Sequence, residues 1–152
     1  MENKKRLQLV LMASLLTGAI IILFRDLSFP SVSLDGTILN FAIGLGAIIA
    51  TNFIAAVPAY GLLKIRHAPN ASAVSILAVL ESFWLGYAFT PIAFSLGGST
   101  AWDVTTVLIV FASYAASDFI LNTWNIGKSR KIGVAVALVF ITMLFSLFLP
   151  RF

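Results

Sequence analysis

The chain has 152 residues, of which 60% are hydrophobic and only 11% are charged. Soluble domains carry about 45–50% apolar and about 25% charged residues, and so small a body has too little interior to hide the excess. With a mean hydropathy of +1.01, the composition excludes a soluble enzyme, a nucleic-acid-binding domain and a disordered chain. It predicts an all-α, polytopic integral membrane protein whose main partner is the lipid bilayer.

Five apolar stretches follow one another along the chain. They cover residues 7–24, 38–63, 71–95, 104–124 and 132–149. A helix of about 20 residues crosses the hydrocarbon core of a bilayer, whereas open strands would leave backbone groups unpaired in lipid. We therefore expect residues 1–152 to form a single transmembrane domain, a bundle of five transmembrane helices.

Turn-forming residues separate these stretches. Pro69 and Asn70 stand between the second and third stretches, and Gly97 and Gly98 open the connection between the third and fourth. Glycine, proline and asparagine favour turns because of their backbone freedom, fixed φ or local hydrogen bonding. The chain is therefore expected to leave the helical conformation at both places.

The basic residues fall on alternate connections of this arrangement. Eight of the ten lie on one side: Lys4, Lys5, Arg6, Lys64, Arg66, Lys128, Arg130 and Lys131. Because cytoplasmic loops carry an excess of lysine and arginine, the pattern predicts that the N-terminus is inside and the C-terminus outside. A four-span arrangement would break the alternation. The expected location is the plasma (inner) membrane, as a multi-pass protein.

Residue types that carry chemistry are scarce. The chain has no cysteine and one histidine, so it cannot by itself form a cysteine zinc site, an iron–sulfur cluster or a two-histidine haem site. The sequence also lacks a serine–histidine pair, a phosphate-binding motif and a glycine-rich nucleotide motif. We therefore predict no catalytic residues, no metal and no cofactor, and a protein that is not an enzyme.

Two ionisable residues, Glu81 and Asp118, lie within the predicted spans, where each costs about 2.5–3.5 kcal/mol near a helix centre. Glu81 is about 15 Å into its span, in the middle of the bilayer. Asn52 and Asp118 should lie at one level and could share a hydrogen bond if their spans touch. Tyr114, Asp118 and Asn122 are four residues apart and form one polar stripe.

These polar residues have more than one interpretation. A carboxyl at the midplane can take up and release a proton as a substrate binds or leaves, which would make Glu81 a coupling or selectivity group. Alternatively, Glu81 and Asp118 hydrogen-bond across helices and hold the bundle together, or they face a partner subunit.

Small residues recur every four positions in two of the spans. Ala42, Gly46 and Ala50 follow this spacing in the second span, and Ser14 and Gly18 follow it in the first. Such faces allow another helix to approach closely. We expect one of these two sets to lie at a contact between chains.

The sequence thus favours a non-catalytic subunit of a larger membrane complex, with other membrane subunits or further copies of itself as partners and no nucleic acid. The alternative is a small oligomeric transporter or channel for an ion or small solute, with Glu81 as its proton-coupling or selectivity group.

Overall fold

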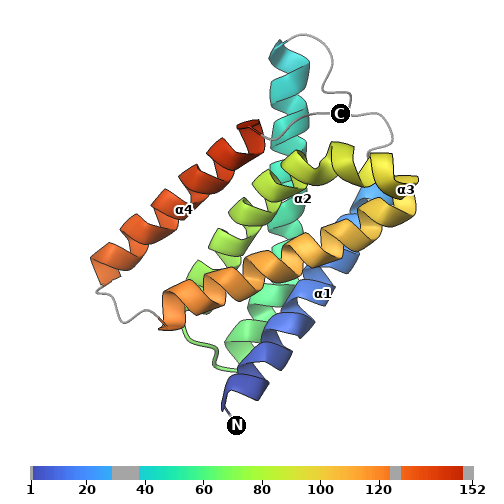
Figure 1. The fold of residues 1–152 in the computed structure, drawn as a ribbon. Helices are drawn as coiled ribbons and strands as arrows, with labels where there is room; N and C mark the ends of the chain where they lie inside the picture. The colour runs from blue at the N-terminus through green and yellow to red at the C-terminus, as the bar shows by residue number, and fades with distance from the viewer. Residues whose placement is uncertain (1, 29–37, 124–127, 149–152) are drawn as a thin grey trace.

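The structure is a computed structural model that describes residues 2–28, 38–123 and 128–148. Four helices make up almost all of it: α1 (Glu2–Ser28), α2 (Ile38–Ile65), α3 (Ala71–Thr123) and α4 (Lys128–Phe148), as Figure 1 shows. The described residues contain no strand. The expected all-helical fold is therefore confirmed.

Helix α3 has two limbs that meet at Gly97 and Gly98. The backbone leaves the helical conformation at both residues, and Gly98 has φ 67° and ψ −139°. Residues with a side chain rarely adopt that combination of backbone angles, whereas glycine adopts it readily. After the bend, the second limb runs back beside the first (Figure 1). The bend lies where the sequence predicted the connection between the third and fourth apolar stretches.

Four segments are long and apolar enough to cross a membrane. They are Glu2–Phe24, Gly46–Ile65, Ala71–Thr90 and Ser95–Asn122, and a shorter apolar segment covers Ile132–Phe145. Large apolar side chains are exposed along these helices, as at Leu108 and Phe140. Exposed apolar surface of this extent is typical of helices that face lipid. The fold is compatible with a multi-pass membrane protein.

The core lies between α1, α2 and the two limbs of α3. Helix α1 packs against α2 and α3, and α2 also packs against α3, whereas α4 packs only against α3 among the described helices. The central apolar cluster contains Val10, Ala13, Ala59, Leu63, Val74, Leu77, Ala78, Val110, Tyr114 and Leu121. Helix α4 therefore lies at the side of the bundle and contributes no fully buried residue to this cluster.

Candidate functional site

Polar side chains are frequent in the core of the described chain. The buried ones are Ser14, Thr17, Asn52, Ser75, Glu81, Ser82, Thr106, Ser113 and Ser117. A polar group away from water is costly unless it is hydrogen-bonded. Several of these hydroxyls meet that need locally, since Thr17 and Thr106 donate to backbone carbonyls four residues earlier in their own helices. Glu81 is the only one of these buried residues with an ionisable side chain, and its carboxyl needs a hydrogen-bond partner from another part of the chain.

Glu81 finds that partner on the other limb of α3. Its side chain is 5% exposed, and its Oε2 lies 3.1 Å from Ser117 Oγ. Ser117 Oγ is also 2.7 Å from the carbonyl oxygen of Ser113. A serine hydroxyl has one proton, so it donates to only one of these two acceptors at a time. The Glu81 carboxyl thus lies inside the bundle and joins the two limbs through one hydroxyl.

Tyr114 links the second limb of α3 to α1. Its hydroxyl is 3.1 Å from Thr17 Oγ1, and the tyrosine is 1% exposed. Thr17 donates its own proton to the carbonyl of Ala13 at 2.9 Å, because a carbonyl can only accept. Tyr114 is therefore the donor to Thr17, and this hydrogen bond fixes α1 against α3.

Asp118, Asn122, Arg6 and Asn70 form a third polar group, which we call the end network. Arg6 Nη2 donates to Asp118 Oδ2 at 3.0 Å, and Asn122 Nδ2 donates to Asp118 Oδ1 at 2.8 Å. Asn70 Nδ2 in turn donates to Asn122 Oδ1 at 2.7 Å. The network ties the first turns of α1 and the α2–α3 turn to the last turns of α3.

The predicted polar residues are therefore brought together only in part. Within the predicted stripe, Asn122 donates to Asp118, while the hydroxyl of Tyr114 donates to Thr17 of α1. Asn52 donates to the carbonyl of Ile48 at 2.8 Å instead of pairing with Asp118. Asp118 instead pairs with Arg6 of α1 and lines a pocket with Leu63 and Arg66, which lie 11 and 14 positions beyond Asn52 in the chain. The two side chains are therefore not at one level, because the spans that carry them differ in length.

Arg6 is a partner of Asp118 that was not predicted from the sequence. A signal for it was present, because Arg6 stands at the start of the first span and Asp118 near the inner end of the fourth span. Both therefore belong to the same predicted side of the membrane. Opposite charges at one level of neighbouring helices are expected to pair when the helices touch.

The two sets of small residues have different environments. Ser14 and Gly18 are buried, and a Cβ added at Gly18 would lie 3.4 Å from Val107 Cγ2 on α3. By contrast, Gly46 is exposed and an added Cβ there would meet no atom within 4 Å. Ala42 and Ala50 on the same face of α2 are also exposed. The first set packs within the chain, and the second is open.

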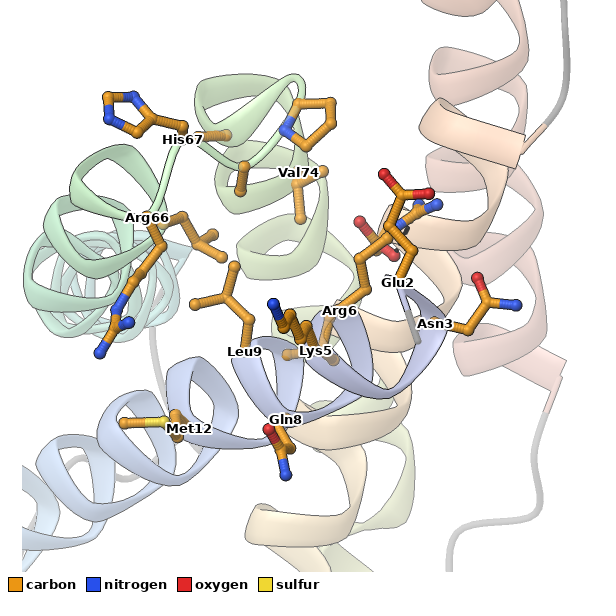
Figure 2. A pocket seen from close by; sticks show the side chains of 16 residues that line it. Glu2, Asn3, Lys5, Arg6, Gln8, Leu9, Met12, Arg66, His67 and Val74 are labelled. Carbon is orange, nitrogen blue, oxygen red and sulfur yellow. Dashed lines mark hydrogen bonds and ion pairs between the residues drawn. The ribbon is translucent and has the colours of Figure 1, made fainter.

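A pocket of about 690 Å³ adjoins the end network. It lies between the first turns of α1, the end of α2 and the start of α3. Figure 2 shows Lys5, Arg6 and Leu9 extending from α1, and Arg66 and His67 from the end of α2 and the following turn. Glu81 is not among its lining residues, so the pocket and the buried carboxyl are separate features.

Within the described ranges, no three histidine, aspartate or glutamate side chains are grouped so that they could hold a metal ion. Comparison with known proteins finds no matching family model, no matching curated protein and no matching solved structure. The class of the protein therefore rests on its physical features: a helical bundle of membrane-spanning character with a polar core and an open small-residue face on α2.

Proposed function

We propose that this chain is a non-catalytic subunit of a membrane assembly, and that the open face of α2 packs against a helix of another subunit. The observation that carries the proposal is the exposure of Ala42, Gly46 and Ala50 along one side of α2. Lipid gives helices no hydrophobic reason to associate, so close packing over small residues has to supply the attraction. A small-residue groove that none of the described residues fills is suited to a second helix.

The chain itself provides the comparison that supports this interpretation. At Gly18, where α1 approaches α3, the second helix lies close enough to contact an added methyl group at 3.4 Å. At Gly46, no atom of the described residues lies within 4 Å of an added methyl group. Helix α4 repeats the pattern, because Gly133 and Ala137 are exposed four residues apart and Gly133 also has no neighbour within 4 Å. This pair on α4 is not among the predicted small-residue sets.

The proposal is tested by particle mass after extraction from the native membrane in mild detergent. We expect the wild type to co-purify in a complex well above the 16.4 kDa of one chain. Gly46→Leu should dissociate it and leave the chain folded. Gly61→Leu is the matched control, because Gly61 is on the same helix, also has no atom within 4 Å, and lies about 22 Å further along. A wild type that runs as a lone monomer at every concentration contradicts the proposal.

A second candidate function is proton-coupled transport through Glu81. The observation that favours it is the shared hydroxyl: Ser117 cannot donate to both Glu81 and Ser113. A protonated Glu81 that donates to Ser117, while Ser117 donates to Ser113, gives every acceptor a proton. Such a carboxyl holds a proton that can leave when a neighbour moves.

The two candidates are separated by Glu81→Gln in liposomes. Glutamine has the shape of a protonated glutamate and can still donate to Ser117, so the variant should fold and keep its particle mass. If the chain is a transporter, the variant loses the pH dependence of solute flux. If it is a structural subunit, wild type and variant show the same absence of flux, and assembly is unchanged.

The membrane arrangement that accompanies this proposal has five crossings, with the N-terminus in the cytoplasm and the C-terminus outside. It is supported by the charge pattern and by the pocket, where Lys5 and Arg66 from separate connections lie at the same end of the bundle. Reporter fusions after Lys5, Ser33, Arg66, Gly98, Lys131 and Phe152 should alternate between inside and outside. Two successive fusions on one side would refute it.

A further inference from the structure

The pocket beside the end network lies where three apolar segments terminate. The segment of α1 starts at Glu2, that of α2 ends at Ile65 and that of α3 starts at Ala71. Lining residues come from all three of these ends. In a bilayer, the ends of such segments lie at the level of the lipid headgroups. The pocket therefore opens into the headgroup layer.

Positive charge in this pocket exceeds negative charge. The lining contains the cations of Lys5, Arg6 and Arg66 and the carboxylates of Glu2 and Asp118. Arg6 and Asp118 neutralise each other in their ion pair, while Lys5 and Arg66 are exposed and form no ion pair within the described residues. Arg6 also has a buried Nε without a hydrogen-bond partner in that part of the chain. Anionic oxygens are the acceptors that suit such donors.

The turn that carries Arg66 is held firmly on both sides. Arg66 N donates to the carbonyl of Leu62 at 3.1 Å, and Ala68 N donates to that of Leu63 at 2.9 Å. Two residues on, Asn70 is bonded to Asn122. A basic group on a backbone that is already fixed loses less freedom when it binds a ligand.

The inner part of the pocket is apolar. Val10, Leu63 and Val74 contribute to its lining, are at most 5% exposed and belong to the central apolar cluster. Leu9 lies between Lys5 of α1 and Arg66 of the α2–α3 turn in Figure 2. An apolar wall contributes nothing to the binding of free phosphate. A phospholipid, by contrast, presents a charged headgroup next to apolar chains, so it can contact both parts of the pocket. Basic pockets between membrane helices are known to suit such headgroups.

We propose that this pocket binds an anionic phospholipid, with Lys5 and Arg66 at the phosphate and the lipid's glycerol and upper acyl carbons against the apolar wall. The binding is independent of the proposed role in assembly. Lipid occupancy and particle mass are separate measurements, so either can fail without the other.

Native mass spectrometry of the detergent-solubilised protein can count bound lipid during titration with phosphatidylglycerol or phosphatidylcholine. We expect one phosphatidylglycerol to bind tightly and phosphatidylcholine to bind weakly. Lys5→Gln and Arg66→Gln should each lower the phosphatidylglycerol affinity about fivefold, the size expected for one basic residue at a membrane surface. Lys4→Gln and Lys64→Gln are matched controls, because these exposed lysines are close in sequence but do not line the pocket.

Three results would overturn the proposal. Equal losses for the control and pocket variants would show diffuse attraction to the basic surface. Equal binding of the two lipids would show that headgroup charge is not recognised. Displacement of phosphatidylglycerol by millimolar inorganic phosphate, with the same variant dependence, would show that the ligand is a free anion. Selective loss in Lys5→Gln and Arg66→Gln, without competition by phosphate, supports it.

Discussion

Replacing Gly18 by leucine tests how closely α1 approaches α3. At this point of contact, a Cβ built on Gly18 lies 3.4 Å from Val107 Cγ2 and 3.6 Å from Val107 Cα. These are van der Waals distances, so one methyl group fits with little adjustment. The three further carbons of leucine do not fit, and one of the opposing atoms is backbone, which cannot rotate away.

Gly18→Ala and Gly18→Leu should therefore change the free energy of unfolding by amounts that differ in sign or size. Gly18→Ala adds a methyl at contact distance and gains up to about 1 kcal/mol of helix propensity, so its stability should equal or slightly exceed that of the wild type. Gly18→Leu overpacks the contact, which typically costs about 1–3 kcal/mol. Gly46→Leu, at a helical position with no neighbour within 4 Å, should not lower the stability of the monomer and gains up to about 1 kcal/mol of helix propensity.

The assay is unfolding of the purified monomer in mixed detergent micelles, followed by circular dichroism as the fraction of denaturing detergent rises. We expect the midpoint to fall for Gly18→Leu alone among the three variants. A Gly18→Leu protein as stable as the wild type would refute the close contact between α1 and α3. A Gly46→Leu monomer that is equally destabilised would show that the face of α2 is not open.

Three further predictions concern single contacts and use the same unfolding assay. Asp118→Asn should cost about 1 kcal/mol, and less at high salt, because the ion pair that it removes is partly exposed; a loss that is insensitive to salt would contradict this. Gly98→Ala should cost about 1–3 kcal/mol, since its φ of 67° and ψ of −139° disfavour a side chain although no atom lies within 4 Å of the added Cβ. Tyr114→Phe should cost about 0.6–1 kcal/mol, because Thr17 keeps its bond to the Ala13 carbonyl, and the loss should vanish in a Thr17→Val background.

Much of the fold follows from the sequence because its causes are local. Apolar runs of about 20 residues can satisfy their backbone in lipid only as helices, and glycines at 97 and 98 allow a bend that other residues resist. Both features act within a few residues of chain. They were therefore visible in composition and spacing, and the structure has helices and a bend at the expected places.

The packing of those helices is less predictable, because it depends on which faces meet. Gly18 and Gly46 occupy the same kind of small-residue motif, yet one is covered by α3 and the other is open. The small-residue motif indicates that another helix can approach closely, but it does not identify that helix. Likewise, the partner of Asp118 is 112 residues away in sequence, and the pocket beside it joins three chain segments that share no local pattern.

The hydrogen bond between Asn70 and Asn122 joins residues 52 positions apart, at the two ends of α3. With the bend at Gly98, it makes the two limbs a closed helical hairpin. Such a hairpin can enter a bilayer as one unit, with its fastened end left behind on the side of synthesis. Between Ser82 and Ser117 the only charged residue is Asp103, so in the proposed five-crossing arrangement a single carboxylate near the bend would cross the hydrocarbon.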